Sequence, residues 1–242
     1  MTYCVGLKLD KGIVFMSDTR TNAGVDNISV FQKMVTWDVP GERVITLMTA
    51  GNLATTQAVI SILDERGKAP SDRSPSVLEE PSMFRVARLV GETLRDVIKN
   101  QTDNGQNASA FSATIIVGGQ IAGSEPRLFM VYAEGNFIEA SADTPFFQIG
   151  ETKYGRPILV RAYDPTMSFE DAMKLLLVSF DSTIKANLSV ALPLDYMTYE
   201  ADSFEISQQG RIDTDNPHFQ NISNGWGDAL RSAFASLPDF KF

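Results

Sequence analysis

The second residue of the chain, Thr2, follows the initiator methionine and carries a hydroxyl group that could act as a nucleophile. A threonine hydroxyl attacks a carbonyl carbon only when a base takes its proton. The chain contains a single histidine, His218, so a serine–histidine catalytic arrangement is nearly excluded. If Met1 is removed, the freed amine of Thr2 can serve as the base, because its ordinary pKa of about 7.7 to 8.0 leaves a useful neutral fraction near pH 7. The pattern predicts acyl transfer by an N-terminal threonine.

Two charged residues and a glycine farther along the chain can support that chemistry. Asp18 ends the second expected strand and Lys33 begins the third, so adjacent strands can bring them together. An ammonium near the amine lowers the pKa of the amine, and a carboxylate holds the ammonium in place. Gly51 ends the fourth expected strand, where a backbone N–H can face a tetrahedral oxyanion. With Thr2, these residues make a complete set for acyl transfer.

The elements that must position these residues follow from the hydrophobic pattern. Residues 3–10 alternate between apolar and other side chains, and Lys11-Gly12 supplies a turn into a second strand at 13–17. Further strands are expected at 31–37, 43–49, 111–117, 127–132, 136–140, 146–150, 195–200 and 203–206. Helices are expected at 53–66, 81–99, 153–163, from a capping box at Ser168 onward, and near 226–235. Strands in blocks followed by helices in blocks indicate an α+β fold with two facing sheets and helices outside.

Composition and charge exclude several classes of protein. A length of 242 residues fits one domain, 1–242, with 43% apolar residues to build its core. A net charge of −9 argues against binding to nucleic acid or an anionic membrane. One cysteine and one histidine leave too few ligands for a zinc site, so we expect no metal and no cofactor. Cys4 is expected to be a buried strand residue rather than a nucleophile. No leader and no membrane span is evident, which predicts a cytoplasmic protein.

The run from Thr2 to Gly51 resembles the β-subunits of proteasomes and their bacterial relative, the HslV peptidase. The residues that carry this resemblance are Thr2, Val5-Gly6, Gly12 to Val14, Ser17 to Arg20, Lys33 and Thr49 to Gly51. Other segments are similar to one bacterial branch, the ancestral β-subunit (Anbu) family, namely Asn22 to Ile28, Phe147 to Pro157, Asn187 to Val190 and Leu192 to Asp195. The resemblance covers most of the chain and leaves a C-terminal extension after about Gly210.

The resemblance implies a four-layer αββα sandwich of the N-terminal-nucleophile hydrolases. It also implies that Thr2 is both nucleophile and base, that Asp18 and Lys33 tune it, and that Gly51 provides the oxyanion N–H. Thr21 and Gly51 would pair with an extended substrate backbone. A specificity pocket for apolar or small side chains would be lined by Phe31, Val35, Thr49 and Leu53.

Two parts of the family pattern differ in this sequence. Family members carry a supporting Asp and Ser pair after the long third helix, for which Asp181, Ser182 and Ser189 are the available matches at an irregular spacing. The serine of a Gly-Ser-Gly turn is replaced by Glu151, directly after Gly150.

Two functions therefore remain open at this point. One is a threonine-type peptidase acting in a self-assembled homo-oligomer, either a ring or an open spiral, on peptide or unfolded-protein substrates. The other is an assembly or binding protein that keeps the sandwich and its pocket but hydrolyses little. Retention or loss of Met1 distinguishes the two functions. The sequence leaves open whether an ATPase unfoldase binds to the assembly.

Overall fold

The amino-terminal hairpin lies at the centre of the molecule. The computed structural model describes residues 2–22, 28–68, 75–102 and 107–242. Strands β1 (Tyr3–Leu9) and β2 (Gly12–Asp18) pair antiparallel, with Cys4 opposite Ser17. Almost every residue of both strands is buried, because both faces of their sheet are covered. The hairpin confirms the expected opening of the chain.

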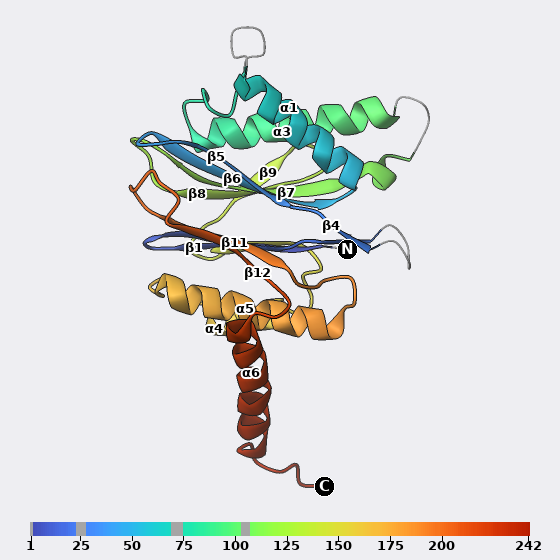
Figure 1. Ribbon diagram of the computed structural model, residues 1–242, viewed down its shortest axis with the longest axis vertical. Coiled ribbons are helices and arrows are strands. Elements are labelled where there is room, and N and C mark those ends of the chain that lie inside the picture. The colour runs from blue at the N-terminus through green and yellow to red at the C-terminus, as the bar shows by residue number, and fades with distance from the viewer. Residues whose placement is uncertain (1, 23–27, 69–74, 103–106) are drawn as a thin grey trace.

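Two five-stranded antiparallel sheets face each other (Figure 1). The first has the order β10 (Phe146–Gly150), β1, β2, β11 (Leu194–Glu200) and β12 (Gln208–Ile212). The second has the order β5 (Met34–Val39), β6 (Arg43–Gly51), β7 (Ala113–Ile121), β8 (Arg127–Val131) and β9 (Phe137–Glu139). A small hairpin of β3 (Arg20–Asn22) and β4 (Ile28–Val30) connects the first sheet to the second.

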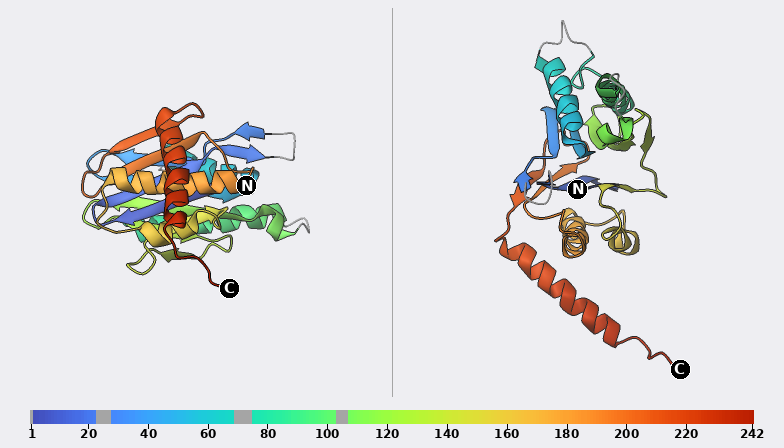
Figure 2. Two further views of the ribbon diagram at one scale, coloured as in Figure 1. Left: turned by 90° about the horizontal axis from the view of Figure 1, so that it is seen from below. Right: turned by 90° about the vertical axis from the view of Figure 1, so that its right-hand side faces the viewer.

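Helices cover the outer face of each sheet. Helices α1 (Leu53–Lys68) and α3 (Met83–Thr102) lie on the second sheet, and α4 (Arg156–Ala162) and α5 (Phe169–Ala186) lie on the first (Figures 1 and 2). A short 3-10 turn, Ala108–Phe111, precedes β7. Ser168 caps α5 by accepting from the N–H of Asp171, as the capping box predicts.

Three apolar layers hold the four layers of secondary structure together. The first joins α1 and α3 to the second sheet, the second joins α4 and α5 to the first sheet, and the third fills the space between the sheets. Strand β1 contributes to two of them, since Tyr3, Val5 and Leu7 face the helices and Cys4 faces the other sheet. The chain thus has the αββα sandwich that the resemblance implied.

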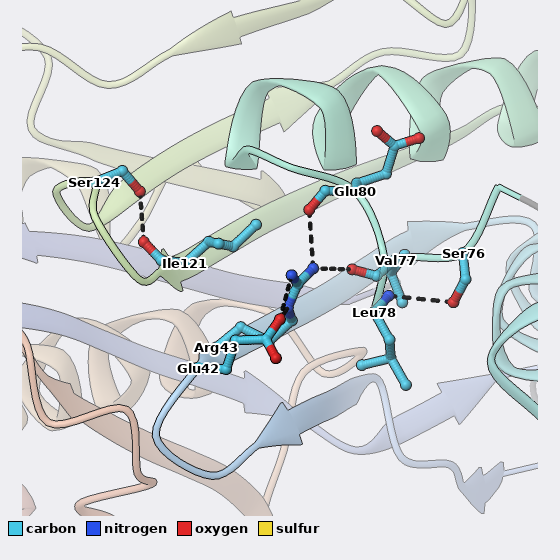
Figure 3. Close-up of polar contacts among 8 residues, drawn as sticks. All are labelled: Glu42, Arg43, Ser76, Val77, Leu78, Glu80, Ile121 and Ser124. Carbon is cyan, nitrogen blue, oxygen red and sulfur yellow. Dashed lines mark hydrogen bonds and ion pairs between the residues drawn. The ribbon is translucent and has the colours of Figure 1, made fainter.

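Arg43 fixes the segment that leads into α3. Its guanidinium is buried and Nη1 donates to the carbonyl oxygens of Val77, at 3.2 Å, and Glu80, at 2.9 Å (Figure 3). Glu42 accepts from Nε of the same side chain at 2.9 Å. Two buried carbonyl groups outside regular structure are thereby paired, which a stable core requires.

The last helix, α6 (Pro217–Ala235), projects away from the sandwich (Figures 1 and 2). Near its start Phe219 is buried against the α5 side of the first sheet. Its far end and the tail expose large apolar side chains, namely Leu230, Phe234, Leu237, Phe240 and Phe242. None of the described helices has the length and apolar character needed to cross a bilayer.

Some expected elements differ from the observed ones. No strand forms at 203–206, because Phe204 and the preceding Asp202 have positive φ of 50° and 63°, and the final strand lies instead at β12. Helix α6 begins well before residue 226, because Asn216 caps it and Pro217 fits its first turn. The β3–β4 hairpin was not expected, since its three-residue strands are too short to show an alternating pattern.

Candidate active site

Thr2 lies at the start of β1, where the neighbouring strand β10 ends. Its carbonyl oxygen accepts a hydrogen bond from the N–H of Glu151 at 2.7 Å. Tyr3 pairs with Gly150 in the β1–β10 register. Gly150 has φ of 83°, and a Cβ atom there would come within 1.9 Å of the Thr2 carbonyl oxygen. A glycine is therefore required where β10 approaches the candidate nucleophile.

Tyr3 anchors the residue that follows the candidate nucleophile. Its backbone N–H donates to Oδ1 of Asp18 at 2.9 Å. Its hydroxyl lies 2.8 Å from Oγ of Ser179 and accepts from Nε2 of Gln148 at 2.5 Å. Burial raises the pKa of Tyr3 to about 12, so the phenol stays neutral. Sequence reasoning missed this anchor, because a strand tyrosine carries no signal of its partners on other elements.

Asp18 and Lys33 meet in a buried ion pair. The ammonium of Lys33 donates to Oδ1 of Asp18 at 2.6 Å and to the carbonyl oxygen of Arg20 at 2.7 Å. The β3–β4 hairpin carries the chain from one residue to the other, which explains how they come together. An ammonium has three donors, and among the described residues only these two acceptors are found. The third donor remains available to a group beside Lys33.

The carboxyl group of Asp18 is held in an unusual environment. It is completely buried, and its second oxygen, Oδ2, has no hydrogen-bond partner among the described residues. Burial raises the pKa of this carboxyl, while Lys33 and the N–H of Tyr3 oppose the shift. Perturbed carboxyl groups of this kind concentrate at functional sites.

One cavity of about 510 Å³ collects most of the expected site residues. It is lined by Thr2, Thr21, Phe31, Lys33, Thr49, Ala50, Gly51, Asn52, Leu53, Thr56 and Gly150. Val35 is not among the lining residues. It lies opposite Leu47 of β6, which belongs to the core under α1 and α3, so Val35 is on the helix side of its sheet.

Gly51 ends β6 at the wall of this cavity. Its φ is 118°, and a Cβ atom there would lie 2.4 Å from the carbonyl oxygen of Ser112. Only glycine therefore fits this position without backbone strain. Lys33 is held against the same strand, because its carbonyl oxygen accepts from the N–H of Thr49 at 3.1 Å.

Comparison with known proteins identifies the family of this chain. The family model described as "Proteasome subunit" matches residues 2–190. The chain is 47% identical to Anbu (ancestral beta-subunit) from Yersinia bercovieri, covering 99% of this chain and 100% of that one, with a TM-score of 0.93. The chain belongs to the Anbu family of proteasome subunits. No curated protein matches it.

Two further Anbu structures share the whole fold. Anbu from Hyphomicrobium sp. strain MC1 is 48% identical over 99% of this chain and 100% of that chain, with a TM-score of 0.91. The Anbu complex from Pseudomonas aeruginosa, solved as a helical assembly, is 43% identical over 99% and 98%, with a TM-score of 0.92. This Anbu chain therefore has the fold of an N-terminal-nucleophile hydrolase of the proteasome type over nearly its full length.

Asp181, Ser182 and Ser189, the residues expected to support Thr2, have other partners among the described residues of this Anbu chain. Asp181 is buried on α5 and its carboxylate pairs with Lys185 at 3.1 Å. Ser189 donates its backbone N–H to Oδ1 of Asn187 at 2.9 Å, and Ser182 donates to Val178. Neither Asp181 nor Ser189 lines the cavity, and no hydrogen bond between described residues joins either to Thr2.

Cys4 has no part in this site beyond packing. Its thiol is buried, lies 3.7 Å from the carbonyl oxygen of Thr49, and has its pKa raised by burial. The thiolate needed for nucleophilic attack is therefore suppressed. Within the described ranges no group of three or more His, Cys, Asp or Glu side chains could hold a metal ion.

Proposed function

We propose that this Anbu chain is a threonine-type N-terminal-nucleophile peptidase that acts in a homo-oligomer after removal of Met1. The proposal is carried by one arrangement. Thr2 and Lys33 line the same cavity, and Lys33 is held by a buried Asp18 that also binds the residue next to Thr2. A rigid ammonium beside an N-terminal threonine is what the chemistry needs.

The reaction begins with a proton transfer within Thr2. The neutral amine takes the proton of the Thr2 hydroxyl as the oxygen bonds to the carbonyl carbon of the scissile peptide. The positive charge of Lys33 lowers the pKa of the amine, so that more of it is neutral near pH 7. Asp18 keeps Lys33 oriented and does not exchange a proton with the substrate.

The tetrahedral intermediate is then stabilised and broken down. The substrate carbonyl oxygen carries the negative charge, and the N–H of Gly51 is our candidate donor to it. The protonated amine of Thr2 gives its proton to the leaving nitrogen, and an acyl-enzyme ester remains on the threonine oxygen. Water, deprotonated by the same amine, hydrolyses that ester and restores Thr2.

The cavity supports a preference for apolar or small side chains. Phe31, Ala50 and Leu53 supply apolar wall, while the hydroxyl groups of Thr49 and Thr56 add little polarity. Thr21 and Gly51 border the same space and can pair with an extended substrate backbone. A cationic side chain would be desolvated there beside the ammonium of Lys33, at a cost in affinity.

The decisive experiment concerns Thr2. Intact mass of protein made in its native host should show the loss of Met1, and Thr2→Ala should abolish turnover of short acyl peptides. Thr2→Ser, which keeps a hydroxyl and an amine, is the matched control and should retain part of the activity. Unchanged turnover in Thr2→Ala defeats the peptidase assignment.

A catalytically weak assembly or binding protein is the alternative. It is favoured by the pairing of Asp181 with Lys185 and by Glu151 in place of the turn serine. Retained Met1 in native material, with no adduct formed on Thr2 by a threonine-directed electrophile, would support this alternative. A labelled Thr2 argues against it.

Self-association is supported by the helical assembly of the relative from Pseudomonas aeruginosa. The apolar end of α6 and the tail provide a surface that this chain leaves uncovered. We propose that a second copy covers part of it. Particle images will separate a closed ring from an open spiral.

A further inference from the structure

The carbonyl group of Thr2 is fixed by a turn whose own shape must be maintained. The N–H of Glu151 donates to this carbonyl at 2.7 Å. That bond holds the peptide between Thr2 and Tyr3 against the turn, and so fixes the position of the backbone that carries the Thr2 side chain. Any rotation of the turn after β10 would move the backbone of Thr2 and change the position of its hydroxyl group.

The side chain of Glu151 ties this turn to the end of α5. Glu151 is 9% exposed, and its Oε2 accepts from Nδ2 of Asn187 at 2.8 Å. Asn187 caps α5 with its N–H on the carbonyl oxygen of Thr183, and its Oδ1 accepts from the N–H of Ser189. The side-chain amide of Asn187 therefore joins the Glu151 carboxylate to the backbone at Ser189, while its backbone N–H closes the end of α5.

The carboxylate of Glu151 has a neutral partner. No cation forms an ion pair with Glu151 in the part of the chain that is described, and its only side-chain partner found there is the amide of Asn187. This bond is therefore the contact through which the side chain of Glu151 links the turn after β10 to the end of α5.

We propose that Glu151 and Asn187 are positioning residues for Thr2, a role that rests on the proposed peptidase function. Asn187 holds the Glu151 side chain, the turn keeps its shape, and the Glu151 N–H holds Thr2 in the orientation for attack. The connection from the end of α5 to Thr2 thus runs through Glu151 and Asn187, rather than through Asp181 or Ser189. Neither positioning residue needs to touch the substrate.

A swap of the two polar groups tests the proposal. Asn187→Asp places two carboxylates face to face and breaks the bond, while the double variant Glu151→Gln with Asn187→Asp restores it with donor and acceptor exchanged. In both, the new Asp can still accept from Ser189. We expect kcat for a peptide substrate to fall about 10- to 100-fold in Asn187→Asp, with KM unchanged, and to recover in the double variant.

Two controls separate positioning from folding. Asn216→Asp introduces the same charge at the cap of α6, away from Thr2, and should leave kcat and KM unchanged. If Asn187→Asp lowers only the melting temperature, with kcat of the folded fraction intact, the proposal is overturned. It is overturned also if the double variant stays as slow as Asn187→Asp.

Hydrogen exchange gives a readout that does not depend on activity. The Glu151 N–H should exchange faster in Asn187→Asp than in the natural sequence, and be protected again in the double variant. Equal protection in all three contradicts the proposal even if no peptide is cleaved. Failure of the peptidase assignment itself is seen separately, as equal turnover by the natural sequence and by Thr2→Ala.

Discussion

The ammonium of Lys33 lies 2.6 Å from Oδ1 of Asp18, and their side chains are 6% and 0% exposed. Oδ1 also receives the backbone N–H of Tyr3, so one oxygen atom connects the ammonium to the residue after Thr2. The position of the ammonium and that of β1 are therefore not independent. Changes to this pair should affect both stability and catalysis.

Lys33→Met should abolish peptide hydrolysis and lower the free energy of unfolding by about 3 to 5 kcal/mol, because it leaves the buried Asp18 carboxylate without its cation. The double variant Lys33→Met with Asp18→Asn should regain most of that stability, since neither group is charged. Its activity should stay lost, because no ammonium adjoins the Thr2 amine. Chemical denaturation and peptide hydrolysis provide the two measurements, and recovery of activity in the double variant contradicts the assigned role.

The raised pKa of Asp18 makes a prediction for stability against pH. Between the unfolded pKa of about 3.9 and the higher folded value, the native state binds more protons than the unfolded state, so ionisation of Asp18 costs stability as pH rises through this window. The free energy of unfolding of the natural sequence, relative to Asp18→Asn, should fall as pH rises from about 4 toward neutrality. If this difference in the free energy of unfolding rises with pH instead, the effect of Lys33 on the pKa of Asp18 is larger than the effect of burial.

Gly150→Ala should disable the site through a backbone clash, because its Cβ would meet the carbonyl oxygen of Thr2. Gly123→Ala is a matched control, since Gly123 has the same φ of 83° but an added methyl group there would meet nothing within 4 Å. We expect the control to cost about 1 to 2 kcal/mol from the left-handed conformation alone and to keep its activity. Melting curves and turnover numbers are measured for both variants. A similar loss of activity in Gly150→Ala and Gly123→Ala would contradict a special role for Gly150.

Replacing Phe234 and Phe240 by serine should weaken self-association with little effect on the fold. Both side chains are exposed, at 78% and 80%, so serine removes little packing within the chain. Particle mass in solution should shift toward smaller species, whereas Gln220→Ser on the same helix should leave it unchanged. If the serine replacements and Gln220→Ser give particles of the same mass, the contact between copies does not involve Phe234 or Phe240.

The sequence identifies the centre of the candidate site better than its periphery. Asp18 ends β2, which pairs with β1 beside Thr2, as the expected hairpin predicts. Lys33, directly before β5, and Gly51, at the end of β6, belong to the other sheet, so the expected pairing of adjacent strands is wrong for Lys33, and the packing of the two sheets brings both residues to the cavity. Val35 illustrates the limit. It lies on the side of its sheet that faces α1 and α3, away from the cavity, and the sequence alone does not tell which of the two sides faces the cavity. The anchoring of Tyr3 by Ser179 and Gln148 joins residues more than a hundred positions apart, which no local pattern reveals.

The same limit explains the elements that were expected elsewhere. The apolar pattern predicted β10 at its observed bounds, because the apolar residues of Phe146 to Gly150 form a short run that ends at a glycine, and the middle of the strand is buried. The segment at 203–206 has a similar pattern but contains a residue with positive φ, Phe204, which strands exclude. Tertiary contacts, such as the bond from the Asp202 N–H to Gln120 at 2.8 Å, hold that conformation.

The bond from Glu151 to Thr2 has a consequence for the order in which the candidate site is assembled. It joins the first strand to a turn that the ribosome produces only after more than half of the chain has emerged. Asn187, which steadies that turn, is made later still. Under the proposed function, a nascent chain would therefore contain Thr2 before the turn that orients it is made, and it could not cleave peptides until the rest of the sandwich has folded.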